Sequence, residues 1–181
     1  MPTLFLSPST QQYNEYILEG REEEQTMNEL ADALQPYLYA MGIDFARNDP
    51  ALTVGGSVAS SNAGDFELHL ALHSNAAGDA SSGQIRGVDV FYYPGSIEGE
   101  RAANLLAGAI ANIYPLPERV AASPNIGLYE LRMTEAPAVL MEIGYHDNYA
   151  DAVWLTENIP AIAEAIALAL SQYYDIQFVS P

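Results

Sequence analysis

The sequence predicts a single α/β domain. Apolar runs of strand length alternate with segments whose apolar residues recur at helical spacing, which is the pattern of an α/β chain. The length of 181 residues suits one compact domain with a substantial core. No linker, composition shift or internal repeat divides the chain, so residues 1–181 are expected to fold as one unit.

The N-terminal half is expected to hold three strands and two helices. A first strand covers 4–7 and ends at Pro8. A helix over about 22–41 carries apolar residues at helical spacing and stops at Gly42, while Pro36 should kink or break it. The remaining elements are a short strand at 44–47, a helix of small residues at 55–62 and a central strand at 66–73.

The C-terminal half continues the alternation. A Gly/Ser/Ala-rich stretch at 78–83 is expected to form a surface loop, and three prolines should make 115–125 irregular. Strands are expected at 88–93, 128–132 and 138–145, and helices at 97–113 and 158–174.

The charge balance argues against two classes of partner. The formal net charge is −18, and all six basic residues are Arg. Nucleic-acid binding depends on cations that neutralise phosphates, and anionic membranes attract basic segments, so neither partner is expected. No apolar run reaches the roughly 18 residues of a membrane span. The N-terminus shows no basic and apolar segments of a signal peptide.

His73 stands where a strand gives way to small polar residues, in Leu72-His73-Ser74-Asn75. In an open α/β sheet, ligands and metals bind outside the carboxyl ends of the strands, so an imidazole there is well placed to contact them. A hydrogen-bonded core histidine is the alternative explanation. His73 gains weight as a site residue from two acidic residues, Glu24 and Glu142.

Each of these acidic residues also has a structural explanation. Glu142 interrupts the apolar run 137–145, where an unpaired charge is costly, and an ion pair with an Arg would account for it. Glu24 closes the run Glu22-Glu23-Glu24 at the start of a helix, where the helix dipole favours acidic side chains.

Together these residue types match a metal hydrolase site. The chain has no cysteine, so a metal must be held by His, Asp, Glu or neutral oxygen donors. A catalytic zinc takes three N or O ligands and lowers the pKa of a bound water to about 7. His73 and Glu24 are the candidate zinc ligands, and Glu142 is the candidate carboxylate that accepts and returns the proton.

Four segments carry a family resemblance. They are Glu24-Gln25-Thr26-Met27-Asn28, Leu72-His73-Ser74-Asn75-Ala76, Arg86-Gly87-Val88-Asp89 continuing to Tyr93, and the run 137–145 followed by Asn148. In order and spacing, from residue 4 to about 174, they resemble the zinc-dependent N-acetylmuramoyl-L-alanine amidases of the amidase_3 group.

The resemblance implies a three-layer fold of the phosphorylase/hydrolase-like type, with a mixed, roughly six-stranded sheet flanked by helices. It also implies that Glu24 and His73 are the second and third zinc ligands, that Glu142 is the catalytic Glu, and that the substrate is peptidoglycan or a muropeptide. Such a substrate in turn implies a cell-wall or extracellular location, for which the sequence shows no export signal.

One position departs from the family pattern. The family's first strand ends in Asp-Pro-Gly-His, whose His is the first zinc ligand, whereas Thr10 holds that position here. A hydroxyl is a poor substitute for imidazole on zinc. His146 is a candidate third ligand or substrate contact. His69 shares the strand face of His73 but lies about 13 Å away at roughly 3.3 Å per residue, so it is not expected to bind the same metal.

The sequence thus favours a peptidoglycan hydrolase that cleaves the N-acetylmuramoyl-L-alanine amide bond with zinc-activated water. Thr10 keeps a second interpretation open, a non-catalytic module that binds peptidoglycan or peptide and has a decayed metal site. A zinc hydrolase of another amide is the third interpretation, because a fold does not fix its substrate.

Overall fold

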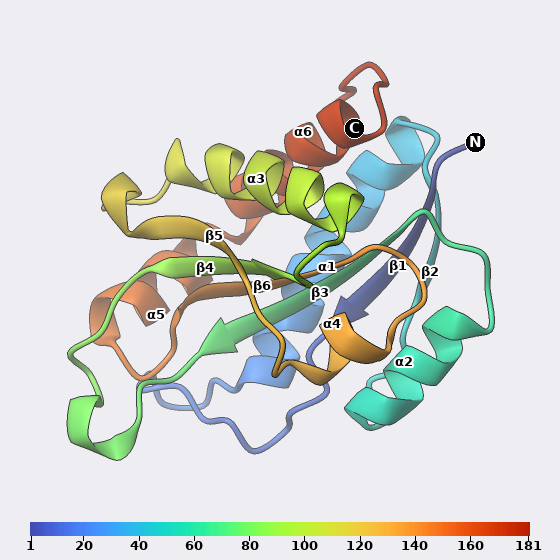
Figure 1. Ribbon diagram of the computed structural model, residues 1–181. Helices are drawn as coiled ribbons and strands as arrows, with labels where there is room; N and C mark the ends of the chain where they lie inside the picture. The colour runs from blue at the N-terminus through green and yellow to red at the C-terminus, as the bar shows by residue number, and fades with distance from the viewer.

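A six-stranded mixed sheet forms the centre of the molecule, with helices on both faces (Figure 1). A computed structural model describes residues 1–181. The strand order is β2-β1-β3-β6-β4-β5; β2, β1, β3 and β6 run parallel, β4 runs antiparallel to β6, and β5 runs parallel to β4. The strands are β1 (Thr3–Pro8), β2 (Asp44–Arg47), β3 (Leu68–Asn75), β4 (Val88–Tyr92), β5 (Val120–Pro124) and β6 (Ala138–Tyr145).

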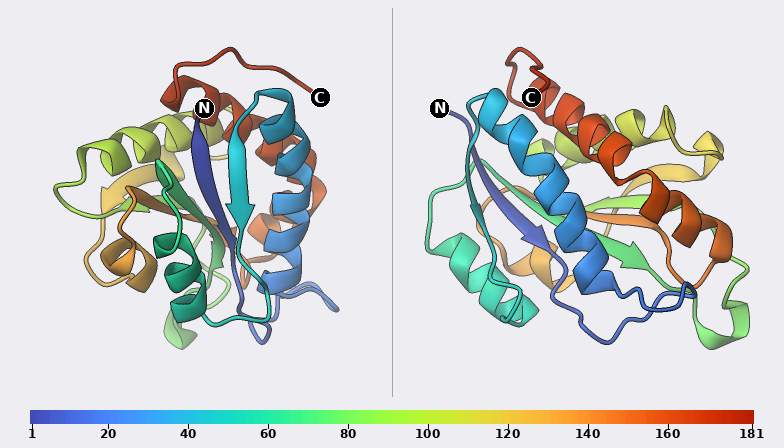
Figure 2. Two further views of the ribbon diagram at one scale, coloured as in Figure 1. Left: turned by 90° about the vertical axis from the view of Figure 1, so that its right-hand side faces the viewer. Right: turned by 180° about the vertical axis from the view of Figure 1, so that it is seen from behind.

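The helices divide unequally between the two faces of the sheet. The six α-helices are α1 (Glu23–Ala40), α2 (Val54–Asn62), α3 (Ile97–Ala111), α4 (Tyr129–Met133), α5 (Tyr149–Glu157) and α6 (Ile159–Tyr173). Helices α1, α3 and α6 pack on one face, while the shorter α2 and α4 lie on the other (Figure 2). The predicted class, a three-layer α/β domain with a mixed six-stranded sheet, is confirmed.

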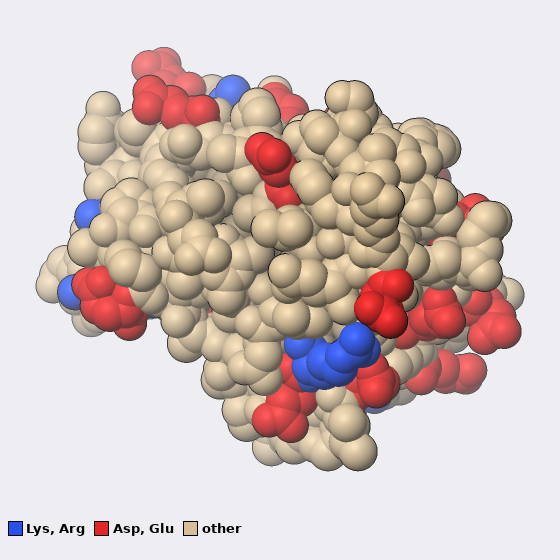
Figure 3. All heavy atoms as spheres, turned by 90° about the horizontal axis from the view of Figure 1, so that it is seen from above, with Lys and Arg blue, Asp and Glu red and all other residues tan.

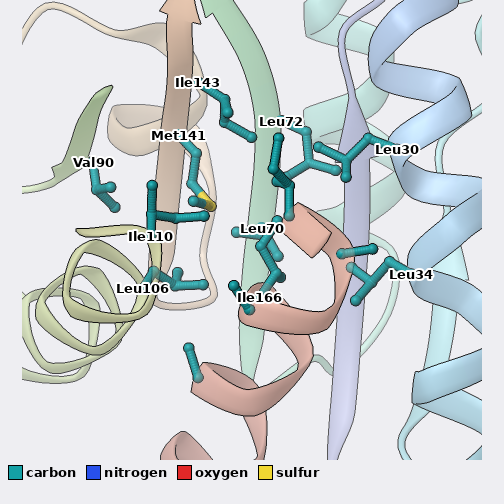
Figure 4. Packing of buried hydrophobic residues seen from close by; sticks show 14 of the residues in the cluster. Leu30, Leu34, Leu70, Leu72, Val90, Leu106, Ile110, Met141, Ile143 and Ile166 are labelled. Atoms are coloured by element: carbon teal, nitrogen blue, oxygen red, sulfur yellow. The ribbon is translucent and has the colours of Figure 1, made fainter. Parts of the chain in front are cut away.

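The main core lies between the sheet and α1, α3 and α6. Side chains alternate along a strand, so Leu70 and Leu72 of β3 point into this layer, where they meet Leu34 of α1 and Ile166 of α6 (Figure 4). A fully buried Leu of this kind contributes roughly 1.5–3 kcal/mol by leaving water. The same alternation turns His69, Ala71 and His73 toward α2 and α4. His69 and His73 therefore face the thinly covered side, whereas Ser74 faces the opposite side, where its hydroxyl accepts a hydrogen bond from Tyr16.

Several local features differ from what the sequence predicts. Residues 128–132 form most of α4 instead of a strand, because a short apolar run does not distinguish the two. The sixth strand is β5, inside the region expected to be irregular; it pairs only with β4, and edge strands tolerate proline. Helix α1 continues past Pro36, which lies on its exposed side, so Pro36 does not break the helix; the other expected effect, a kink, stays a prediction. Helix α5 was not expected from the sequence.

Acidic side chains dominate the charged surface. Figure 3 shows one face, on which acidic groups are scattered and the basic groups lie close to acidic ones. Four of the six arginines form ion pairs with carboxylates elsewhere in the chain, namely Arg21, Arg47, Arg86 and Arg101. No single helix has both the length and the apolar character needed to cross a membrane, although α5 and α6 pass that test together as a bent pair.

Candidate active site

A cleft opens at the carboxyl ends of β1, β3 and β6, on the side that α2 and α4 cover. Its volume is about 470 Å³, and its walls come from β1 and the turn after it, α2, α4, β3 and β6. The strand register sets His73 of β3 beside Glu142 of β6, and both side chains line the cleft. On the other side of Glu142, the register pairs it with Asp89 of β4. Two residues predicted from the sequence, His73 and Glu142, are thus neighbours.

His73 is held between two carboxylates. Its Nδ1 lies 2.9 Å from Oε1 of Glu23, and its Nε2 lies 3.0 Å from Oε2 of Glu130. An ionised carboxylate can only accept a hydrogen bond, so both ring nitrogens donate and the ring is an imidazolium. Burial alone would lower the pKa of His73, but the hydrogen bonds and charges of Glu130 and Glu23 outweigh burial and raise that pKa to about 10.

The acidic partner from α1 is Glu23, not Glu24. The helix begins at Glu23, whose buried side chain points to His73 and also accepts a 2.6 Å hydrogen bond from Asn14. Burial alone would raise the pKa of Glu23, but the hydrogen bond and charge of His73 more than offset it and lower the pKa. One residue further along a helix is about 100° around its axis. The side chain of Glu24 accordingly bonds Asn28 of its own helix.

Glu130 of α4 connects three polar side chains of the site through hydrogen bonds. Its Oε1 accepts hydrogen bonds from the Ser7 hydroxyl at 2.6 Å and from Nε2 of His69 at 3.1 Å, while its Oε2 accepts from His73. Burial alone would raise the pKa of Glu130, but the hydrogen bonds from His69 and His73 dominate and hold the pKa well below its ordinary value. The carboxylate is therefore ionised although only 3% of the residue is exposed.

The sequence analysis did not identify Glu130, because it placed 128–132 in a strand. A pattern of buried polar residues nevertheless indicates that an acidic partner is needed here. His69 and His73 lie four residues apart on one face of a buried strand, and Ser7 is on the same face of the neighbouring strand. Buried polar side chains need partners, so three of them facing one way indicate a shared acidic group from another element.

Glu142 differs from the other two carboxylates in lacking hydrogen-bond donors. Its Oε2 is buried and has no partner, and no ion pair of the chain includes Glu142, so the Arg partner considered as a structural explanation is absent. Burial raises the pKa of Glu142 to about 7; the positive charge of His73 opposes the rise, while the negative charges of Glu23 and Asp89 add to it. This carboxyl group can exchange a proton near neutral pH.

Of the two remaining predicted residues, Thr10 and His146, only Thr10 is among the residues that line the cleft. The ring of His146 is buried, 3.0 Å from the Ser74 hydroxyl, and stacks on Tyr16 at 5.1 Å between centroids. His146 thus shares a hydrogen-bonded group with Ser74 and Tyr16, not with His73 and Glu142.

The donor set does not complete a three-ligand zinc site. Glu23 and His73 contact each other, but the second ring nitrogen of His73 is bonded to Glu130, and Thr10, which was expected at the family's first-ligand position, brings only a hydroxyl to the cleft. No three His, Asp or Glu side chains are placed so that they could hold a metal ion. The residues present therefore do not fit the three-ligand arrangement of a catalytic zinc.

Comparisons with known proteins place the chain among amidases. The profile of the Amidase_3 family, described as N-acetylmuramoyl-L-alanine amidase, matches residues 11–172. The N-acetylmuramoyl-L-alanine amidase from Clostridium difficile 630 has a similar structure, with a TM-score of 0.84, 17% identity, and coverage of 96% of this chain and 97% of that chain. The catalytic domain of CwlV, an N-acetylmuramoyl-L-alanine amidase from Bacillus (Paenibacillus) polymyxa var. colistinus, gives 0.83 and 18%, covering 98% and 100%.

A curated relative is similar over part of its length. The uncharacterized protein YqiI of Bacillus subtilis (strain 168) is 27% identical over 131 residues, which are 71% of this chain and 61% of that protein. The chain therefore spans about three fifths of the length of this relative. At these low identities the solved structures establish the fold, and the profile match establishes the family.

Proposed function

Because the chain belongs to the Amidase_3 family of N-acetylmuramoyl-L-alanine amidases, we propose that it hydrolyses the amide bond between the lactyl group of N-acetylmuramic acid and L-alanine in peptidoglycan. The observation that carries the proposal is the state of Glu142. It lines the cleft beside His73, and its Oε2 is buried without a partner. A buried acceptor without a donor has an unmet hydrogen bond, which a water molecule or a substrate group admitted to the cleft would satisfy, as a catalytic base requires.

In the proposed reaction, Glu142 moves the proton. It accepts a proton from the attacking water while the new C–O bond forms, and it returns the proton to the amide nitrogen as the C–N bond breaks. The products are a lactyl carboxylate and a peptide with a free α-amine. A pKa of about 7 suits both steps, because the group is a competent base and a competent acid near neutrality. The charge of His73 favours the ionised form of Glu142 that starts the cycle.

Zinc activation of the water, which the family resemblance implies, is not part of these steps, because the residues present do not complete a zinc site. A zinc ion bound in such a site would supply a Lewis acid for the scissile carbonyl and would lower the pKa of a nearby water. In this chain Glu23 and His73 are the two groups that match zinc ligands, in place of the Glu24 and His73 pair expected from the sequence. Because a third protein ligand is missing, the steps above depend on Glu142 and the cleft alone.

A second function, binding of peptidoglycan without cleavage, has an observation of its own. Both ring nitrogens of His73 are hydrogen-bonded, one to Glu23 and the other to Glu130. Neither nitrogen is therefore free to bind a metal ion. Thr10, at the position where the family is expected to have a His ligand, also favours this second function. A protein of this second kind would bind cell-wall fragments equally well with a chelator present.

The test is cleavage of a defined muropeptide, followed as new α-amine. The wild-type protein should release the peptide, and Glu142→Gln should lose roughly 10²–10⁴-fold of the rate, the usual contribution of a general base. Glu135→Gln removes an exposed carboxylate outside the cleft and should leave the rate unchanged. Equal rates for wild type and Glu142→Gln, or no cleavage by the wild type with zinc supplied, would contradict the amidase proposal.

Elemental analysis of the purified protein tests separately whether the chain binds zinc. If Glu23 and His73 hold zinc, loading should give about one zinc per chain in wild type and much less in Glu23→Gln. His146→Ala should retain the wild-type content, because His146 contacts Ser74 and Tyr16 instead of His73. Loss of zinc in His146→Ala would instead show a site rebuilt around that residue.

A further inference from the structure

The loop between β1 and α1 folds back onto the start of α1, where Asn14 contacts Glu23. An isolated β-bridge joins Glu15 to Glu22, so that residue 14 lies beside residue 23. The carbonyl oxygen of Asn14 accepts a 2.9 Å hydrogen bond from the backbone N–H of Glu23. The side-chain Nδ2 of Asn14 donates to Oε2 of Glu23 at 2.6 Å. Asn14 therefore holds both the backbone and the carboxylate of the first residue of α1.

The same amide nitrogen connects Glu23 to the wall of the cleft. Nδ2 of Asn14 also donates to Oε1 of Gln11 at 2.8 Å, and Gln11 is one of the residues that line the cleft. A carboxylate can only accept hydrogen bonds, so the nitrogen end of the Asn14 amide must face Glu23. An amide nitrogen carries two N–H donors, which match these two acceptors. The orientation of the Asn14 side chain is thereby fixed.

Glu23 extends the connection to His73. Its other oxygen, Oε1, lies 2.9 Å from Nδ1 of His73, and the strand register places His73 beside Glu142. Glu23 is only 1% exposed, so solvent cannot readily replace a donor that its carboxylate loses. Asn14 is not among the residues that line the cleft. Any effect of Asn14 on the cleft is therefore exerted through Gln11 and Glu23.

We propose that Asn14 is a positioning residue for the reaction in the cleft, because it holds Glu23 against His73 and Gln11 at the cleft wall. The inference rests on the proposed function, since it assumes that hydrolysis takes place at Glu142 beside His73. Small misplacements of the groups around the reacting atoms lower a rate strongly. Loss of the contact with Glu23 should therefore lower kcat, whereas loss of the contact with Gln11 alone should act on KM.

Kinetics of muropeptide cleavage test the two contacts with matched variants. Asn14→Ala removes the donor and keeps the backbone carbonyl that α1 uses, and its kcat should fall about tenfold. Asn14→Asp keeps the shape but turns an acceptor toward Glu23, so its kcat should fall at least as far. Gln11→Ala should keep the wild-type kcat and raise KM about threefold, the effect of one hydrogen bond.

Gln12→Ala is the control, because Gln12 is an exposed residue of the same loop. It should match wild type in both kcat and KM. A wild-type kcat in Asn14→Ala, or an equal loss of kcat in Gln12→Ala, would overturn the proposal. If Asn14→Asp does not fold, the comparison between Asn14→Ala and Gln12→Ala decides the question.

Solvent exchange of the His73 ring protons, measured by NMR, tests the same contact without any cleavage. In Asn14→Ala the Nδ1 proton, which Glu23 accepts, should exchange about fivefold faster than in wild type. The Nε2 proton, which Glu130 accepts, should keep the wild-type rate. Equal rates at Nδ1 in the two proteins, or an equal acceleration at both nitrogens, would contradict a specific hold of Asn14 on Glu23.

Failure of the amidase proposal has a different signature. A wild-type protein that cleaves no muropeptide removes the proposed function. Faster exchange at Nδ1 alone would in that case still support the hold of Asn14 on the Glu23–His73 pair, and unchanged exchange would overturn it. Intact cleavage with unchanged exchange and unchanged kcat in Asn14→Ala removes only the role of Asn14.

Discussion

At the scale of single residues, three carboxylates close to one imidazole are held in different states. Glu23 and Glu130 each receive a hydrogen bond from His73, and the pKa of both lies below its ordinary value. Glu142 receives none, and burial raises its pKa to about 7. Glu23 and Glu130 therefore hold the imidazole ring of His73 in one orientation, and Glu142 can exchange a proton near neutral pH. Environments that drive the pKa values of neighbouring acids apart are typical of acid–base sites.

The buried bonds of Glu130 predict a large effect on stability. In Glu130→Gln the carboxylate is lost while His69 and His73 stay buried, so the free energy of unfolding should fall by about 3 kcal/mol. Ser7→Ala removes one hydrogen bond to the same group and should cost about 1 kcal/mol. Urea unfolding measures both, with Glu135→Gln as the control. A Glu130→Gln midpoint equal to wild type would show that the network adds nothing to stability.

The raised pKa of Glu142 predicts that this residue makes the folded protein less stable at higher pH. A folded-state pKa above the unfolded value of 4.5 gives stability that is complete below 4.5 and is lost as the pH rises through about 7. Glu142→Gln does not titrate and should escape this loss. Its stability relative to wild type should therefore increase by about 2 kcal/mol between pH 4.5 and pH 8, a value reduced from the full shift because solvent reaches part of the group.

Urea unfolding of both proteins across this pH range measures the difference. A constant difference between wild type and Glu142→Gln would mean that Glu142 titrates with an ordinary pKa. In that case the residue would not hold a proton near neutrality, and its role in proton transfer would lose its physical basis.

At the scale of elements, helix and strand ends decide which side chains reach the cleft. The start of α1 at Glu23 places the side chain of Glu23, not that of Glu24, against His73, and the short helix α4 places Glu130 among the residues that line the cleft. The sequence predicted α1 and β3 from their periodicity. It could not fix the first residue of α1, because Glu22, Glu23 and Glu24 are chemically equivalent at a helix start.

Pro36 allows a test at this scale. It lies inside α1, where a proline removes one backbone hydrogen bond, and its side chain is exposed. Pro36→Ala should raise the free energy of unfolding by about 1–2 kcal/mol, since the gain in helix propensity is partly offset by a more flexible unfolded chain. Thermal unfolding checks this against Gln35→Ala, which should change stability by less than about 0.5 kcal/mol. A destabilised Pro36→Ala would indicate that the helix is built around a bend at this position.

At the scale of the whole molecule, the unequal cover of the sheet accounts for the position of the cleft. The large helices shield one face, and α2 and α4 leave room on the other for polar side chains from β1, β3 and β6. The alternation of apolar runs and helical segments was enough to predict an α/β domain, whereas the three layers and the six-stranded sheet were predicted from the family resemblance. His73 and Glu142 were also accessible to sequence reasoning, since each is a polar residue in an otherwise apolar strand.

Glu130 was not accessible in that way. It depends on contacts between elements far apart in the sequence, with Ser7 and with His73. Local patterns carry no information on such contacts. Thr10, at the position expected for the family's first zinc ligand, was visible in the sequence, but the bond from His73 to Glu130 emerges only from the folded chain.

The most direct test of the central claim is the mass spectrum of peptidoglycan fragments after incubation with wild-type protein and with Glu142→Gln. The proposed amidase predicts free stem peptides beginning with L-alanine, together with glycans bearing an intact lactyl carboxylate, from wild type alone. Unchanged fragments with both proteins, or the same fragments from both, would contradict a hydrolytic role for Glu142 in this cleft.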